Sequence, residues 1–315
     1  MIRPSALLVA LVAGVTSALL FAGLVVESAT AIGLALVAPM PIVIASLGWG
    51  SVAGFAAAAL AGLTIAALFG DAASGLSIIA TIALPAAVAG HFCGLARPAA
   101  AQPANDMPSP RLDWYPLPGI LFAVIASVTL GCLFYGWLAD FDPAALNDAL
   151  SDALRQQAGM QAELTDAQLQ QLSQLVVRLV PFAQPALLVL VHVVNLYVGA
   201  AVTRASGRLP RPKDDVPASA GLPWIAIVLL AVAALLCLEG GLIGAVAAAV
   251  AGALTAGFTL VGLAAMHRRT RGRAGRGLVL FAAYAAILLL TFPILVFTVI
   301  GIMETARVRR AGKRH

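Results

Sequence analysis

The sequence from Leu242 to Met266 is LIGAVAAAVAGALTAGFTLVGLAAM, and none of its residues is charged. A helix of about 20 apolar residues crosses the hydrocarbon core of a bilayer, so this stretch predicts a transmembrane helix. Small residues recur here at every fourth position, which lets another helix approach closely, from within the chain or from another subunit. The two stripes are Gly240, Gly244, Ala248, Gly252, Ala256 and Gly241, Ala245, Ala249, Ala253, Gly257.

The whole chain is similar to this stretch in composition. Of its 315 residues, 61% are hydrophobic and 10% are charged, whereas a soluble domain carries about 25% charged residues. Because so few polar residues cannot cover a water-facing surface, we expect an integral membrane protein of the cell inner membrane, with the lipid bilayer as its main partner. The net charge of +5 does not indicate a nucleic-acid partner, since the basic residues lie in short loops between apolar runs.

Nine apolar segments can be placed along the chain. They are Ser5–Val26, Ala31–Leu47, Ser51–Gly70, Leu76–Phe92, Gly119–Ala139, Pro181–Val202, Leu222–Leu238, Leu242–Met266 and Gly277–Met303. We therefore expect an all-α fold, a polytopic transmembrane helical bundle with eight or nine membrane segments that forms a single domain over residues 1–315. The count depends on the ninth segment, which Phe292-Pro293 interrupts near its middle.

Basic residues orient the predicted bundle, because loops rich in Lys and Arg stay on the cytoplasmic side. Arg3 places the N-terminus in the cytoplasm, and three basic connections follow on the same side: the linker 93–118, the loop Arg204–Lys213 and the basic loop 267–276. A ninth segment that spans the membrane would put the basic tail outside. We favour a re-entrant segment that bends at Phe292-Pro293 and keeps the tail inside; a spanning segment with an external tail is the alternative.

The longest polar stretch, 140–180, is predicted to be an extracytoplasmic insertion. It holds six acidic residues and two arginines. Pro143 suits the first position of a helix, and Thr165 with Gln168 has the spacing of a capping box. Apolar residues recur at helical spacing after both starts. We therefore expect an amphipathic helical hairpin that lies on the membrane face or caps the bundle, with a solvated loop as the alternative.

Several motifs of enzymes are absent from the sequence. There is no GxxxxGK[ST] phosphate loop, and there is no HExxH or GxSxG. No two of the four histidines are spaced to share a metal on one helix face, and the three cysteines have neither metal-ligand nor redox spacing. We therefore expect a protein that is not an enzyme and that has no metal and no cofactor.

One candidate ligand-binding site is a polar pair in the sixth segment. His192 and Asn195 are three residues apart and share a helix face. An ionisable residue inside an apolar segment suggests a functional site by default, and this pair can bind a polar ligand or relay a proton. The alternative is an interhelical hydrogen bond that fixes the packing. Tyr197 and Gln184 are weaker companions of the pair.

A second candidate ligand-binding set comprises Glu27, Asp71 and Glu239, which lie at the predicted outer rim of the bundle. These carboxylates can form a polar mouth for a ligand that arrives from outside. The alternative is that they are ordinary interface residues on short turns.

The first segment carries a stripe of small residues for helix packing or subunit docking. Its members are Ala6, Ala10, Gly14, Ala18 and Ala22.

Two blocks of the sequence point to a family. The first is Ala38-Pro39-Met40-Pro41-Ile42 followed by Leu47-Gly48-Trp49-Gly50-Ser51-Val52-Ala53-Gly54. The second is the apolar run broken at Phe292-Pro293, followed by Gly301-Ile302-Met303-Glu304 and a basic tail. Both resemble the YybS-like family, an uncharacterised group of bacterial membrane proteins. That family is similar to the substrate-binding S components of energy-coupling-factor transporters and, more distantly, to the rod-shape protein MreD.

These observations leave two functions open. The first is a substrate-binding transport subunit that lacks its own ATPase and works with other membrane subunits and a separate ATPase. The resemblance to S components implies that the stripe on the first segment docks a shared transmembrane subunit. The second function is a membrane scaffold or cell-envelope morphogenesis protein, for which the acidic insertion would be the external docking surface.

Overall fold

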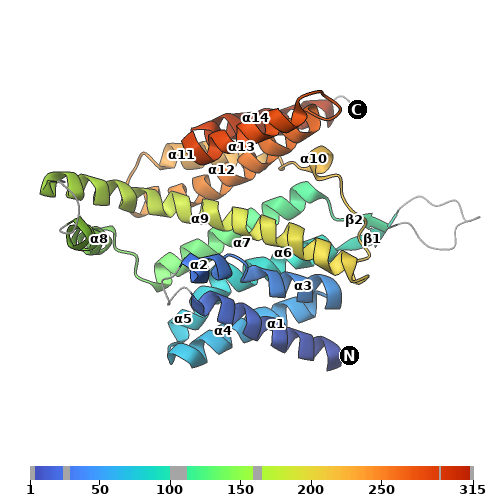
Figure 1. Cartoon of the computed structure of the whole chain (residues 1–315), viewed down its shortest axis with the longest axis horizontal. Helices are drawn as coiled ribbons and strands as arrows, with labels where there is room; N and C mark the ends of the chain where they lie inside the picture. The colour runs from blue at the N-terminus through green and yellow to red at the C-terminus, as the bar shows by residue number, and fades with distance from the viewer. Residues whose placement is uncertain (1–3, 24–28, 100–111, 159–164, 291, 313–315) are drawn as a thin grey trace, which may run out of the picture.

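The computed structural model describes residues 4–23, 29–99, 112–158, 165–290 and 292–312 (Figure 1). Within these ranges the chain is almost entirely helical, with one short antiparallel strand pair. The elements are α1 (Pro4–Ala22), α2 (Ala29–Ala35), α3 (Pro39–Trp49), α4 (Ser51–Phe69), α5 (Ala72–Ile78), a π-helix (Ile79–Ala83), α6 (Leu84–Gly94), β1 (Ala96–Pro98), β2 (Leu112–Trp114), α7 (Leu117–Leu138), α8 (Pro143–Ala158), α9 (Asp166–Ala205), α10 (Val216–Ser219), α11 (Ile225–Leu236), α12 (Gly241–Arg269), α13 (Arg276–Leu290) and α14 (Pro293–Gly312). The all-α fold class is confirmed for the described residues.

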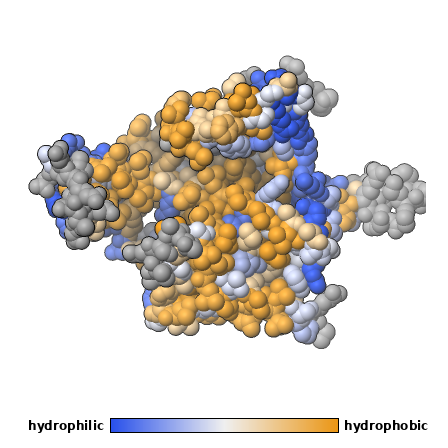
Figure 2. All heavy atoms as spheres, in the orientation of Figure 1, coloured by the Kyte–Doolittle hydropathy of each residue, from blue (hydrophilic) through white to orange (hydrophobic). Residues whose placement is uncertain are grey.

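Seven helical stretches in the described ranges are long and apolar enough to cross a membrane. They are Pro4–Ala22, Ala31–Trp49, Ser51–Phe69, Ala72–Gly94, Leu117–Leu138, Ala167–Ala205 and Gly241–Arg269. Two shorter apolar helices, α11 and α13, fall in the predicted seventh and ninth segments. Apolar residues cover much of the visible face, and hydrophilic residues gather at its two ends (Figure 2). The chain is therefore a multi-pass membrane protein.

Two hydrophobic cores lie on either side of the long helix α9 (Figure 1). One core is built mainly from α1, α3, α4 and α6 and includes the fully buried Ile42. The other is built mainly from α7 and α12 and includes the fully buried Phe258. Leu188 and Leu196 of α9 pack against both cores. Helix α9 is thus the wall that the two halves of the bundle share.

Small residues bring α1 and α4 into backbone contact. A Cβ atom added to Gly14 would lie 2.6 Å from the Ala57 carbonyl oxygen of α4, so no larger residue fits there. Ala10 and Ala18, on the same stripe of α1, have no exposed surface. Around Gly14 the stripe predicted from the sequence therefore packs within the chain.

The predicted ninth segment is two helices in the structure. Helix α13 ends at Leu290 and α14 begins at Pro293. The break lies where the sequence predicts it, because proline has no N–H to donate and its ring clashes with the preceding helical turn.

Helix α14 runs parallel to α12. The hydroxyl oxygens of Thr259 and Thr298 are 2.9 Å apart, and further along both helices Arg268 donates to Glu304 at 2.7 Å. Because the paired positions advance in the same direction on the two helices, the end of α14 lies beside the basic loop 267–276. The two chain ends marked in Figure 1 lie at the same end of the molecule.

Helix α9 extends beyond the bundle and forms an arm with α8. Its 40 residues give a length of about 60 Å, roughly twice the thickness of a bilayer core. The capping box predicted at Thr165 is confirmed, since the Thr165 N–H donates to Gln168 Oε1 at 2.9 Å. Helix α8 packs on the first half of α9, where Ser151 donates to Ser173 at 2.8 Å. We call these two segments, residues 143–158 and 166–180, the α8–α9 arm.

The arm differs from the sequence prediction in one respect. The second helix of the predicted insertion and the sixth predicted segment form one continuous helix, which contains Pro181 and Pro185. Each proline removes one backbone hydrogen bond, but the flanking turns remain helical. The arm lies at the end of the molecule opposite the two chain ends (Figure 1).

Candidate functional site

His192 and Asn195 are buried and contact backbone carbonyl groups. His192 is 1% exposed and Asn195 is 2% exposed. The Nε2 atom of His192 lies 3.0 Å from the Ile82 carbonyl oxygen, and its Nδ1 atom lies 2.8 Å from the Leu188 carbonyl oxygen. The Asn195 amide donates to the Leu36 carbonyl oxygen at 2.8 Å.

The carbonyl groups that this pair contacts on other helices lie where those helices are irregular. Ile82 belongs to the π-helix. Leu36 lies between α2 and α3, where the Met40 N–H donates to Val37 at 3.0 Å instead of to Leu36. A carbonyl without its usual donor needs another partner when it is buried, and Asn195 supplies one. The pair therefore joins α9 to two interrupted helices.

Two of the three predicted rim carboxylates, Asp71 and Glu239, are described by the structure, and they belong to different halves of the bundle. Asp71 caps α5 by accepting hydrogen bonds from the Ser74 N–H at 2.8 Å and the Ala73 N–H at 3.1 Å. Hydrogen bonds from Ser74 and Ala73 lower the pKa of Asp71 below its ordinary value. Glu239 is exposed in the turn between α11 and α12, in the other half of the bundle. Glu27 lies outside the described residues.

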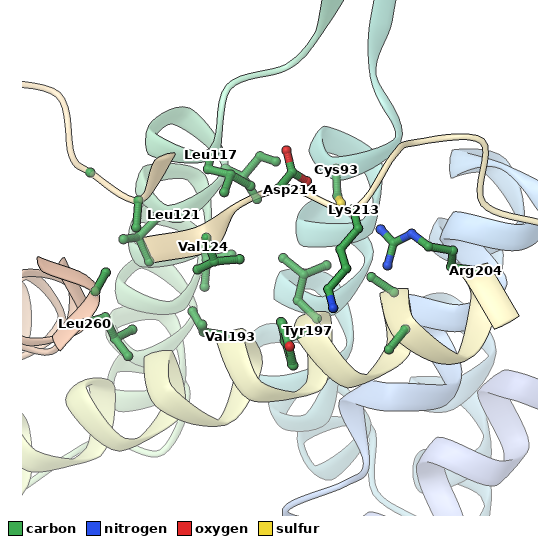
Figure 3. A pocket seen from close by; sticks show the side chains of 18 of the residues that line it. Cys93, Leu117, Leu121, Val124, Val193, Tyr197, Arg204, Lys213, Asp214 and Leu260 are labelled. Atoms are coloured by element: carbon green, nitrogen blue, oxygen red, sulfur yellow. The ribbon is translucent and has the colours of Figure 1, made fainter. Parts of the chain in front are cut away.

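A cavity of about 510 Å³ lies between the two cores, at the end of α9 that is remote from the arm. Its walls come from the end of α6, from α7, α9 and α12, and from the segment around α10 (Figure 3). We call it the inter-core cavity. Its volume falls in the range of about 300–1,000 Å³ that is typical of small-molecule sites.

The wall of the inter-core cavity is mostly apolar, and its polar groups gather at one side. Helices α7, α9 and α12 contribute leucine, valine and alanine side chains. The polar groups are those of Cys93, Tyr197, Arg204, Lys213 and Asp214. This distribution of an apolar chamber and a polar mouth suits an amphipathic molecule.

A buried arginine holds the loop that forms the mouth. Arg211 is 2% exposed, and its Nε and Nη2 atoms donate to the Asp214 carboxylate at 2.8 and 3.0 Å. Its Nη1 atom donates to the carbonyl oxygens of Cys93 at 3.2 Å and Tyr115 at 3.0 Å. These bonds fasten the loop to the end of α6 and the start of α7, and so fix where Lys213 and Asp214 lie.

The mouth carries an excess of positive charge. Asp214 is paired with Arg211, and Asp215 is paired with Arg271. The hydrogen bond from Arg271 lowers the pKa of Asp215, and each of the two carboxylates offsets the charge of the arginine that it pairs with. Arg204 and Lys213 remain, and among the described residues neither forms an ion pair with a carboxylate. A second depression, lined by Lys213, Asp215 and Arg271 among others, adjoins the mouth.

Sequence reasoning identified only part of this site. The sequence predicts Tyr197 as a companion of His192, but Tyr197 lies on a different face of α9 and lines the inter-core cavity. For Lys213 the sequence pattern indicates only a basic loop. The one available signal was that it is one of two lysines in the chain. Within the described residues, no three His, Cys, Asp or Glu side chains gather as a metal site.

Comparison with known proteins does not assign this chain to a family. No family model, no curated protein and no solved structure matches it.

Proposed function

We propose that this chain is a membrane-embedded binding subunit of a transport system, which holds a small amphipathic molecule in the inter-core cavity. The observation that carries the proposal is the cavity of about 510 Å³ itself, with apolar walls and a charged mouth. Concave sites of this size, with mostly apolar walls and a few polar groups, are typical of proteins that bind small molecules. Because the chain has no phosphate loop, a separate ATPase would supply the energy.

We also propose an inner-membrane location with a cytoplasmic N-terminus. Hydrophilic residues gather at the end of the molecule that carries both marked chain ends (Figures 1 and 2). Arg204 and Arg268 lie in the last turns of α9 and α12, and Arg208 and Arg271 lie in the connections that follow these helices. Basic residues at such positions favour the cytoplasmic side. In this orientation the cavity mouth faces the cytoplasm and the α8–α9 arm lies outside. The resemblance to the YybS-like family, and through it to S components, supports the same role.

The alternative function is a membrane scaffold or cell-envelope morphogenesis protein, and the α8–α9 arm favours it. Leu172, Leu175 and Leu179 of the arm are 42%, 55% and 51% exposed. Exposed leucines on a helix pair that projects from the bundle suit the docking of a second protein. The packing of His192 and Asn195 against backbone is equally compatible with this function.

Native mass spectrometry of the intact assembly separates the two functions. The protein would be purified in mild detergent from native membranes. We expect a bound small molecule, together with ATPase and membrane coupling subunits. Cell-envelope or division proteins without any ligand mass would overturn the transport proposal in favour of the scaffold.

A substitution that fills the cavity tests whether the bound molecule lies in it. Ala201 lines the inter-core cavity, and its neighbour Val202 does not. Val202 is 46% exposed on the outer face of α9. We expect Ala201→Phe to remove the bound mass and Val202→Phe to retain it, with both proteins folded. Equal ligand occupancy in the two variants would place the ligand elsewhere.

A further inference from the structure

Within the part of the chain that the structure describes, the two cations at the mouth of the inter-core cavity, Arg204 and Lys213, form no ion pair with a carboxylate. Asp214 and Asp215 are each paired with another arginine. Among the described residues, Arg204 donates to the carbonyl oxygens of Arg211 at 3.3 Å and Pro212 at 3.4 Å, which leaves most of its five N–H donors for a ligand. Two positive charges at one opening repel each other unless an anion lies between them.

Lys213 is aimed into the cavity. Its side chain extends from the loop toward Tyr197, and the Arg204 guanidinium points toward the same opening (Figure 3). Lys213 lines both the inter-core cavity and the adjoining depression. The Tyr197 hydroxyl adds a neutral hydrogen-bond donor at the same place. The three side chains thus place hydrogen-bond donors on the polar side of the cavity, next to its apolar walls.

We propose that the ligand of the inter-core cavity is an amphipathic anion: Lys213 and Arg204 bind its phosphate or carboxylate headgroup, and its apolar chain lies along α7, α9 and α12. This inference rests on the proposed binding function. Charge-assisted hydrogen bonds to an oxyanion are stronger than neutral ones, and the apolar walls favour a hydrocarbon chain. A cationic ligand would meet two like charges at the mouth.

The size of the cavity limits the ligand. Its volume of about 510 Å³ lies within the range of about 300–1,000 Å³ that is typical of small-molecule sites, and a short single-chain amphiphile is a molecule of this class. Decyl phosphate is therefore a suitable probe, and decyl trimethylammonium and decanol are matched probes with a positive head and a neutral head.

The test measures binding of labelled decyl phosphate to the full chain in phosphatidylcholine nanodiscs. We expect decyl phosphate to bind at least tenfold more tightly than decanol, and decyl trimethylammonium not to compete. Lys213→Gln should raise the Kd about 10- to 100-fold, and Lys213→Arg should restore most of the affinity. Arg208 is the matched control. It lies in the same basic loop, stacked over Trp49 at 4.2 Å and outside the cavity lining, so Arg208→Gln should leave the Kd unchanged.

The outcomes distinguish the two proposals. If the three probes bind equally, or if Lys213→Gln and Arg208→Gln behave alike, the anion proposal is overturned. The binding function then stands, provided that Ala201→Phe still blocks the probes. If none of the probes binds the wild-type protein, both proposals fail. Phosphatidylglycerol nanodiscs identify the natural source of a confirmed anion: competition indicates a bilayer lipid, and its absence indicates a soluble amphiphile.

Discussion

Replacing Asn195 by leucine tests whether the buried polar pair of α9 is structural. The substitution keeps the branched shape and the number of side-chain heavy atoms, and it removes the amide that donates to Leu36 at 2.8 Å. The Leu36 carbonyl cannot turn to the Met40 N–H, because that group already donates to Val37. A buried acceptor left without a donor costs about 1–3 kcal/mol. Interhelical hydrogen bonds inside membrane proteins average about 0.6 kcal/mol and reach about 1.7 kcal/mol. We therefore expect Asn195→Leu to lower the free energy of unfolding by about 1–2 kcal/mol.

The assay is reversible unfolding by dodecyl sulfate from mixed micelles, with decyl phosphate binding measured on the same preparations. Val194→Leu is the control, because Val194 is next to Asn195 in the chain and is 58% exposed. It should change neither the free energy of unfolding nor the Kd for decyl phosphate. Because Asn195 does not line the inter-core cavity, its substitution should leave the Kd for the ligand unchanged. An Asn195→Leu variant of unchanged stability that no longer binds ligand would refute this reasoning and make Asn195 a ligand-binding residue.

Two further substitutions test the mouth and the C-terminal helices. Arg211→Gln removes the ion pair with Asp214 and the hydrogen bonds that hold the loop. We expect the free energy of unfolding to fall by about 3 kcal/mol and the ligand to bind more weakly. Gly262→Val places a side chain against the backbone carbonyl of Phe297 in α14; we expect it to separate α12 from α14 at a cost of about 2 kcal/mol or more, measured in the same unfolding assay.

Each of these substitutions has a matched control. Arg208→Gln removes an exposed arginine of the same loop together with its contact to the Trp49 ring, and it should lower the stability by no more than about 1 kcal/mol. Gly277 in α13 has open space around its Cβ position, so Gly277→Val should be tolerated. An Arg211→Gln variant as stable as wild type would show that the loop is not fastened by this arginine. Equal effects of the two glycine substitutions would show that helix propensity, and not contact with α14, determines the cost.

The spanning helices could be predicted because each is encoded in one continuous stretch. Leu242–Met266 is long and apolar enough by itself, and α12 contains it. Local signals also located the start of α9 at Thr165 and the break before Pro293. These features depend on neighbours three or four residues apart, which the sequence displays directly.

The inter-core cavity could not be predicted, because it depends on how distant segments assemble. Cys93, Leu117, Tyr197, Lys213 and Ala264 line it from five parts of the chain. No sequence pattern within any one of these five segments predicts the cavity. Periodicity also could not decide whether Pro181 ends a helix, because a proline inside an apolar helix is tolerated when the surrounding turns stay paired. For this reason the second half of the predicted insertion and the predicted sixth segment are one helix, α9, in the structure.

The two polar sets on α9 point in different directions, and this separation makes their roles independent. At about 100° per residue, His192 and Asn195 lie on one side of the helix, and the cavity-lining Tyr197 and Arg204 lie well over 90° away. Sites that share no partner usually contribute additively, within about 0.5 kcal/mol. We expect the Asn195→Leu/Lys213→Gln double variant to have the stability of Asn195→Leu and the ligand affinity of Lys213→Gln. The coupling energy in each of the two cycles, one for unfolding and one for binding, should stay within about 0.5 kcal/mol. A larger coupling would mean that the ligand and the α2–α3 break respond to each other through α9, as expected if α9 moves when the cavity fills.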